Sequence, residues 1–271
     1  MTPTEVRGLL NELDRRLGAE VALMWRAASV NLSSNEFRAL VIDAYPEIVT
    51  PYAAAASELG VEWYDSAPST TNYQPVPGDL PSEERLTTSA SWALNTGNSV
   101  TAVGLLQGSA TRALFDGLRE TVLENVDREP GARWARHASA NACGFCKMIA
   151  TRHVGPNATF YSSASAAGGV VGRGKEMSAA DRRDRAAGRT RRSGEGQRGQ
   201  YLAGGRRARG NQSIGDKYHD NCHCIAVMVR PGQNYTPPSY VDKWNDEYIA
   251  ATKKMSGPLN PNEIARLMDP H

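Results

Sequence analysis

The sequence contains no long hydrophobic run, and no apolar stretch approaches the roughly 18 residues that a membrane-spanning helix needs. The first residues, Met1 to Glu5, have neither the basic start nor the apolar stretch of a signal peptide. We therefore expect a protein that is made and kept in a cytoplasm and has no membrane partner. Disulfides are rare in such a compartment.

Signatures of known enzyme classes are also missing. The chain has no G-x-S-x-G nucleophile turn, no H-E-x-x-H zinc motif and no Walker phosphate loop. His137, His153 and His219 together with the serines would permit a Ser–His pair, but most chains of this size carry such residues. The sequence therefore identifies no catalytic residue, and it favours a role without enzyme activity.

The chain as a whole has little excess charge, because 31 Lys and Arg are opposed by 29 Asp and Glu, for a net charge of +2. This average conceals an uneven distribution. Residues 165–215 contain 12 basic and 4 acidic residues, a net charge of +8, which leaves −6 for the rest of the chain. The basic charge thus belongs to one segment, which needs its own explanation.

Ten arginines of this segment stand among Gly, Ala and Ser, a setting suited to phosphate contacts without base reading. They are Arg182, Arg183, Arg185, Arg189, Arg191, Arg192, Arg198, Arg206, Arg207 and Arg209. One interpretation is non-specific contact with double-stranded DNA. The alternative is a solvated loop, or one that docks on an acidic protein surface.

The first 130 residues have the spacing of α-helices. Thr2-Pro3-Thr4-Glu5 and Ser33-Ser34-Asn35-Glu36 are capping boxes, and each precedes apolar residues at intervals of three and four. Pro46 and Pro51 lie within the second of these stripes, so we expect a kink or a break there. Stripes of this kind are typical of a helical bundle.

A loop rich in proline is expected at residues 65–81, and helix signals resume near Ser82. A further stripe then runs from Leu106 to Val126 at intervals of four. We interpret these residues as core without chemistry of their own. Residues 1–130 are therefore predicted to form a helical N-terminal domain.

The pattern changes after residue 130. Residues 132–149 are compatible with a helix, and residues 158–161 and 224–229 with strands. Residues 163–215 contain few large apolar groups and are expected to be flexible in the free protein. Helices are expected again at residues 240–254 and 262–268.

The predicted fold class is α+β, mainly α. Residues 131–230 would form a small Cys/His module that contains the flexible basic loop at about 164–215, and residues 231–271 a helical tail. The module has little apolar core of its own, so it needs another source of stability.

All four cysteines of the chain fall in two tight pairs, in Cys143-Gly144-Phe145-Cys146 and in His219-Asp220-Asn221-Cys222-His223-Cys224. A C-x-x-C turn presents two thiolates to one point, and Zn²⁺ prefers four such ligands in a tetrahedron. Spacing alone does not choose the remaining ligands, because His219, Cys222, Cys224 and His223 are all candidates. The candidate ligands are Cys143, Cys146, His219, Cys222 and Cys224, and His223 is expected on the opposite face of the strand.

Three interpretations of this pattern compete with a structural zinc site. They are a pair of disulfides, four buried free thiols, and a catalytic zinc with an open water position. A redox role for the C-x-x-C is disfavoured, since no thioredoxin-like βαβ pattern surrounds it. We favour one structural Zn²⁺ that closes the long loop between the two cysteine pairs.

The run from Trp134 to His137, the two cysteine pairs and Tyr161 together resemble the MuF-like minor head proteins of tailed bacteriophages. That family is marked by a paired cysteine motif and a His-x-x-Cys-x-Cys signature that leads into a strand. The resemblance covers roughly residues 130–230. Asp220 stands where a proline commonly follows the histidine in that family.

The resemblance implies a minor capsid protein of the virion that acts in head morphogenesis, inside the capsid and near the portal. Its partners would be the portal and the major capsid or scaffold protein, and packaged DNA through the basic segment. Proteins at this position in actinophage-like genomes are often labelled capsid maturation protease, which is the alternative function. A non-specific DNA-binding module is a second alternative, and no catalytic residue is carried over.

Overall fold

The computed structural model describes residues 1–30, 32–98, 100–151, 170–171, 189–191, 201–203, 212–213, 221–255 and 260–269. The chain divides into two compact units, both of which are made of separate stretches of sequence. The first consists of Met1–Arg128 with Tyr218–Ala226, and the second of Glu129–Lys217 with Val227–His271. The described part is mainly helical with few strands, as the sequence predicts.

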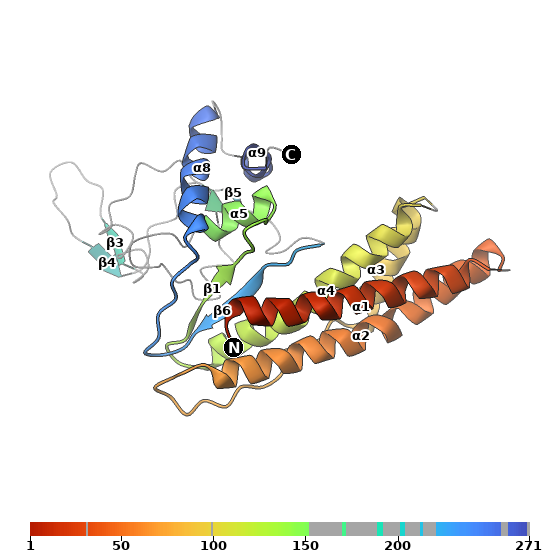
Figure 1. The fold of residues 1–271 in the computed structure, drawn as a ribbon, viewed down its shortest axis with the longest axis horizontal. Helices are drawn as coiled ribbons and strands as arrows, with labels where there is room; N and C mark the ends of the chain where they lie inside the picture. The colour runs from red at the N-terminus through yellow and green to blue at the C-terminus, as the bar shows by residue number, and fades with distance from the viewer. Residues whose placement is uncertain are drawn as a thin grey trace. The chain divides into compact units, whose positions relative to one another are not determined.

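The first unit contains four helices: α1 (Pro3–Ala28), α2 (Ser34–Ser66), α3 (Glu83–Thr96) and α4 (Ala102–Arg128). Helix α2 packs along α1, α3 and α4, and α4 also packs along α1 and α3 (Figure 1). Helix α4 is buried over most of its circumference because it has neighbours on several sides. The helical bundle expected from the apolar stripes is present.

Both capping boxes form as predicted. The Thr2 hydroxyl accepts a hydrogen bond from the Glu5 backbone N–H, and the Glu5 carboxylate accepts one from the Thr2 N–H. Ser33 and Glu36 exchange the same pair of bonds at the start of α2. Each box satisfies N–H groups that the first helical turn leaves without partners.

A kink or a break was expected at the two prolines, and the helix does not break there. Helix α2 is continuous from Ser34 to Ser66 with Pro46 and Pro51 inside it. A proline in a helix interior removes one backbone hydrogen bond and costs about 3 kcal/mol. Burial of α2 against three other helices outweighs this local cost, which a sequence stripe does not reveal.

Helices α2 and α4 approach each other closely through small residues. A Cβ atom on Gly117 would lie 2.3 Å from the carbonyl oxygen of Ala53, so only glycine fits there. One turn further on, the hydroxyls of Ser57 and Thr121 share a 2.7 Å hydrogen bond in the buried interface. The pair of helices is therefore fixed in register as well as in distance.

The proline-rich loop predicted at residues 65–81 is present between α2 and α3, and α4 holds it. The Asn125 carboxamide accepts hydrogen bonds from the Tyr73 hydroxyl at 2.7 Å and the Val76 N–H at 2.9 Å. The Gly78 N–H donates to the Thr121 hydroxyl at 3.0 Å. Polar residues on α4 thus replace the regular hydrogen bonds that a loop lacks.

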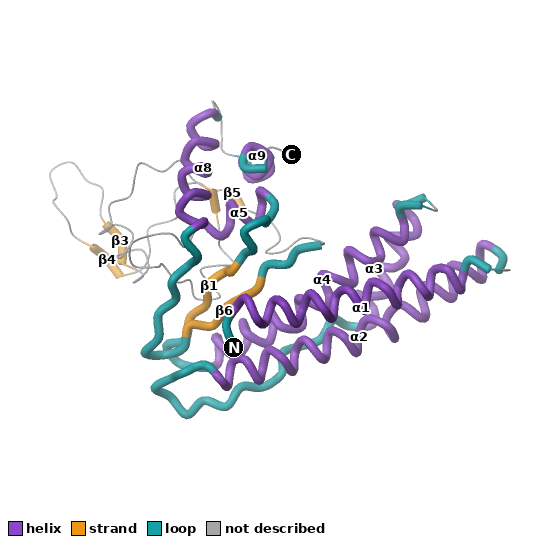
Figure 2. The backbone as a smooth tube through the Cα atoms, viewed as in Figure 1, coloured by secondary structure: helices purple, strands orange, loops and turns teal. Residues whose placement is uncertain are grey.

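The second unit contains the strands β1 (Arg133–His137) and most of β6 (Ile225–Val229), and the helices α5 (Gly144–Ala150), α8 (Tyr240–Lys254) and α9 (Pro261–Leu267). Strands β1 and β6 pair in a two-stranded sheet, and α5 packs on α8 and α9 (Figure 2). Strand β6 and helices α8 and α9 agree with the sequence prediction.

The prediction of a helix over residues 132–149 is wrong for its first part. Residues 133–137 form β1, and only residues 144–150 are helical. The apolar periodicity of so short a stretch does not distinguish helix from strand. Pairing with β6, almost 90 residues later in the sequence, decides for the strand.

Four further strands belong to the segment that was predicted to be flexible. β2 (Val170–Val171) pairs with β5 (Gln212–Ser213), and β3 (Arg189–Arg191) pairs with β4 (Tyr201–Ala203), both antiparallel. The rest of residues 163–215 lies outside the described residues, as does the strand predicted at 158–161. The flexibility of this segment stays a prediction.

Candidate metal centre

The turn from Asn221 to Cys224 leads into β6. Asn221 has a φ of 58°, a left-handed conformation that asparagine tolerates better than most residues. Its N–H donates to the Gly108 carbonyl of α4 at 3.4 Å, and a Cβ on Gly108 would lie 2.6 Å from the Asn221 side chain. The turn therefore starts in close contact with α4.

Arg119 of α4 holds the backbone of this turn. Its Nε and Nη2 donate to the Cys224 carbonyl oxygen at 2.9 and 2.7 Å, and Nη2 also donates to the Cys222 carbonyl oxygen. Arg119 itself is completely buried. The carbonyl groups of both cysteines are thus bound by one guanidinium group.

Other residues of the helical unit fix the guanidinium group. The Asp116 carboxylate accepts a hydrogen bond from Arg119 Nη1 at 3.1 Å and another from Arg85 Nη2 of α3 at 2.7 Å. The Phe115 ring lies below the guanidinium, with 5.2 Å between the ring centroid and the Arg119 Cζ. Residues of both α3 and α4 therefore fix the position of the Arg119 side chain.

His223 faces away from the neighbouring sulfur atoms, as its position between the cysteines predicts. Its Nδ1 shares a 2.8 Å hydrogen bond with the Asn11 carboxamide oxygen, and its ring packs on Phe115 with 4.9 Å between the centroids. Its Nε2 lies 3.9 Å from the Asp14 carboxylate. The His223 side chain is thus used to dock the turn on α1 and α4.

Helix α5 carries the C-x-x-C pair. Cys143 is its N-cap residue and Cys146 lies in its first turn, half-buried and buried respectively. A Cβ on Gly144 would lie 1.9 Å from the Ala265 carbonyl oxygen, so the backbone of α9 lies directly against this glycine. The Gly144 N–H also donates to the Asp269 carboxylate at 3.1 Å. The glycine of the motif therefore serves contact with α9.

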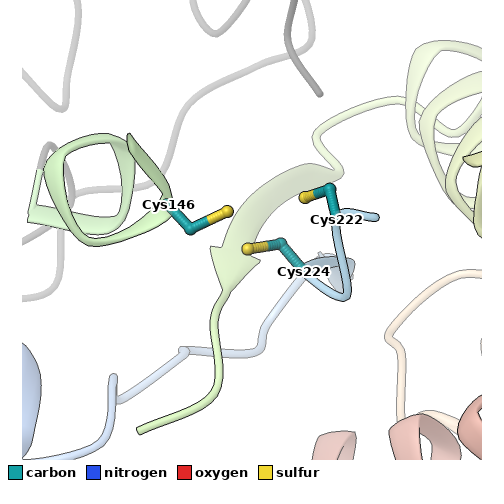
Figure 3. A group of neighbouring side chains, drawn as sticks. All are labelled: Cys146, Cys222 and Cys224. Carbon is teal, nitrogen blue, oxygen red and sulfur yellow. The ribbon is translucent and has the colours of Figure 1, made fainter. Parts of the chain in front are cut away.

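Three of the four cysteines come together. The sulfur atoms of Cys146, Cys222 and Cys224 all lie within 4.8 Å of one another, and all three residues are buried (Figure 3). Figure 3 shows the side chains of Cys222 and Cys224 directed toward that of Cys146. None of the cysteines is in a disulfide. The three thiols could bind a metal ion.

The group is compatible with a bound metal ion. For zinc, with Zn–S bonds of about 2.3 Å, the sulfurs of a tetrahedral site would lie about 3.8 Å apart, which is below the 4.8 Å limit of the separations here. Three buried thiol donors also match the soft ligands of a structural site. Cys143 is not part of the group, and His219, which was predicted as a ligand, lies outside the described residues.

The other predicted site residues are brought together only in small part. Arg189 and Arg191 lie in β3, and the remaining eight arginines of the basic segment lie outside the described residues. His153 also lies outside them. His137 is buried, and its Nδ1 shares a 2.8 Å hydrogen bond with the Tyr235 hydroxyl, which agrees with a packing role.

Sequence reasoning missed Arg119 and Asp116, which hold the cysteine turn. No local signal set this Asp-x-x-Arg pair apart, because α4 also carries other charged residues such as Arg112, Glu120 and Glu124. The identity of the partners could not be read, because they lie more than 100 residues away.

The comparison with protein-family models identifies a protein of viruses that infect bacteria. The chain matches the family described as VG15 protein over residues 4–179 and 197–251 and belongs to that family, which is a family of viral (phage) proteins. No curated protein and no solved structure matches the chain. Among the helices that the structure describes, none is both long and apolar enough to cross a membrane.

Proposed function

We propose that this chain is a minor capsid protein of the phage head, which acts in head morphogenesis near the portal and contains a structural zinc centre. The observation that carries the proposal is the convergence of three buried cysteines from the two motifs that resemble MuF-like proteins. Membership of a phage protein family supports the viral setting. The partners would be the portal and the major capsid or scaffold protein.

The chemistry of the donors supports a structural and not a catalytic metal. Catalytic zinc sites rely mostly on histidine and carboxylate ligands and keep one position open to water, whereas structural sites are closed and rich in cysteine. The three described donors are thiols and are buried. We propose that Cys143 or His219 supplies the fourth ligand.

The proposal is tested in phage particles. The gene is deleted from the phage and complemented with the wild-type chain or with a Cys146→Ser variant. Proheads and mature particles are then examined by electron microscopy and quantitative mass spectrometry. We expect a few copies of the chain per wild-type head and aberrant or empty heads after deletion. Heads that lack the chain and are normal without it would overturn the proposal.

The same particles test the alternative of a capsid maturation protease. If the chain were the protease, the major capsid or scaffold protein would stay uncleaved in the deletion phage. Adding the purified chain would then restore the cleavage. Mass spectrometry of the capsid protein termini measures this directly. We expect the same termini with and without the chain, because the sequence contains no signature of a nucleophile and base.

Non-specific contact with packaged DNA is a second candidate function. It is favoured by the net charge of +8 in residues 165–215, and the lack of a series of stacking aromatics in that stretch of sequence argues against sequence-specific recognition. Retention on duplex DNA of unrelated sequences, measured from low to high salt, tests it. We expect equal binding to all sequences and a steep loss with salt, and both effects should disappear when residues 182–209 are replaced by a neutral linker.

A further inference from the structure

Arg119 makes contacts that reach beyond its own helix to the backbone of the cysteine turn. A completely buried arginine is costly, because water no longer hydrates its charge. Besides Asp116, its bonding partners include the peptide oxygens of Cys222 and Cys224, two of the three residues whose sulfurs converge. An apolar residue at this position of α4 could fill the space, but it could not bind these two carbonyl groups.

The shape of the guanidinium group suits this task. Its N–H groups lie in one plane and diverge at fixed angles, so that Nε and Nη2 reach carbonyl oxygens two residues apart. Fixing the carbonyls of residues 222 and 224 limits rotation of the peptide units that follow Cys222 and Cys224. The two Cys side chains, which leave the same short stretch, then keep one direction (Figure 3).

The guanidinium group is itself held in place by neighbouring side chains. Asp116 binds Arg119 and Arg85 at once, and its side chain is 9% exposed. Phe115 lies against the guanidinium and also against the ring of His223. A chain of hydrogen bonds therefore runs from Arg85 through Asp116 and Arg119 to the backbone carbonyl groups of both cysteines.

We propose that Arg119 is a positioning residue of the metal centre. By binding the Cys222 and Cys224 carbonyl oxygens it holds the two thiols ready as a pair, and Asp116 and Arg85 keep its side chain in place. This inference rests on the proposed metal centre. Outer partners of this kind typically change metal affinity by about 10- to 100-fold when they are lost.

The test uses the full chain with Zn²⁺ and with Co²⁺, whose absorption spectrum reports thiolate ligation and tetrahedral geometry. Arg119→Lys keeps the charge but cannot span both carbonyls, so we expect roughly 10- to 100-fold weaker zinc binding in competition with a chelating indicator. The Co²⁺ bands should also weaken or shift. Arg128→Lys is the matched control, since Arg128 ends the same helix and is half exposed, and it should bind as the wild type does.

A second variant guards against a folding defect in Arg119→Lys. Arg85 is 45% exposed and is connected to the turn through Asp116 and Arg119, so Arg85→Lys should fold normally, with helical circular dichroism like that of the wild type. We expect it to weaken zinc binding by a smaller factor than Arg119→Lys does. The graded order of the two variants would not arise from a general loss of stability.

The outcomes separate this inference from the metal centre itself. If the wild-type chain binds neither ion, the proposed metal centre is wrong and Arg119 has nothing to position. If the wild type binds zinc and Arg119→Lys or Arg85→Lys binds it equally well with the same Co²⁺ spectrum, the metal centre stands and the role of Arg119 is overturned.

Discussion

In both units, buried charged side chains connect segments of the chain that lie far apart in the sequence. In the second unit, Glu129 and Arg230 are both buried and form a bidentate pair with N–O distances of 3.1 to 3.3 Å. Glu129 directly follows α4 in the sequence, and Arg230 directly follows β6. The removal of one partner from such a pair costs about 3 to 5 kcal/mol, because the other charge remains buried. Paired charges therefore fix chain segments here with little room for substitution.

The first residue-scale prediction concerns the metal ligands. Cys146→Ser should lower the zinc content from about one ion per chain to almost none, because a neutral hydroxyl replaces a thiolate in the converging group. Cys143→Ser should weaken binding less, since three buried thiols remain. Elemental analysis after purification without chelator and thiol titration measure both variants. Full zinc content in Cys146→Ser would contradict the assignment.

His223→Ala is the matched comparison for the cysteine variants. The His223 ring is bonded to Asn11 and packs on Phe115, away from the sulfurs, so its loss should leave the zinc content unchanged. The variant should instead lose about 1 kcal/mol of unfolding free energy with the hydrogen bond. Urea unfolding of the zinc-loaded protein measures that loss. Zinc release by His223→Ala would show that the ligand set is different.

The starts of α1 and α2 were predictable to the residue, because a capping box is a local pattern. The carboxylates of these boxes carry a pH dependence: hydrogen bonds to the Thr2 backbone and hydroxyl lower the pKa of Glu5 from 4.5, and bonds to the Ser33 hydroxyl and backbone lower that of Glu36. A lowered pKa means that the folded state prefers the ionised carboxylate. The boxes therefore stabilise the helices above pH 4.5, and this contribution is lost as the pH falls through the lowered pKa.

The corresponding prediction uses Glu36→Gln, which keeps the size of the side chain and removes its titration. The melting temperature of the wild type should exceed that of the variant at pH 6, and the difference should shrink as the pH falls below 4.5. Calorimetry at several pH values measures the difference. A gap that stays constant with pH would show that the carboxylate charge plays no part in the cap.

Contacts between elements far apart in the sequence were not predictable. Gly144 reads as an unremarkable residue of a C-x-x-C turn, yet α9 lies against it, and Arg119 reads as a surface charge of α4. In each case the partner is more than 100 residues away, and no local pattern encodes it. The convergence of Cys146, Cys222 and Cys224 was predictable, because residue type and spacing carry that signal, whereas Cys143 is not in the group. The strand β1 was missed for the same reason as the contacts of Gly144 and Arg119, because its pairing partner β6 lies far away in the sequence.

At the scale of elements, Gly144→Ala should force α5 and α9 apart. Its Cβ would lie 1.9 Å from the Ala265 carbonyl oxygen, and a backbone atom cannot move aside alone. We expect a loss of at least about 1 to 3 kcal/mol in unfolding free energy and weaker zinc binding through Cys146. Gly8→Ala is the control, because nothing lies within 4 Å of that Cβ, and it should stabilise α1 by up to about 1 kcal/mol. Equal stability of the two variants would contradict the close approach of α5 and α9.

At the scale of the whole molecule, the helical unit is not one continuous piece of the sequence. It includes residues 218–226, which supply the carbonyl acceptors of Arg119 and the ring that packs on Phe115. The prediction that residues 1–130 fold as a helical domain by themselves stays open to experiment. The structure adds a condition to this prediction. Such a fragment would lack the carbonyl oxygens that offset the cost of burying the Arg119 guanidinium group.

This condition predicts that replacing Arg119 changes the unfolding free energy by different amounts in the full chain and in the fragment. In the full chain, Arg119→Met should cost about 3 to 5 kcal/mol of unfolding free energy, because Asp116 loses its buried partner and two carbonyl groups lose their donor. In a fragment of residues 1–130 those carbonyls are absent, and water can reach the guanidinium. There the same substitution should cost no more than about 1 kcal/mol, or should stabilise the fragment as an apolar replacement often does. Urea unfolding followed by helical circular dichroism measures both chains. Equal costs in the two chains would mean that Arg119 serves the helices alone, and an unfolded fragment would mean that residues 218–226 are part of the minimal folding unit.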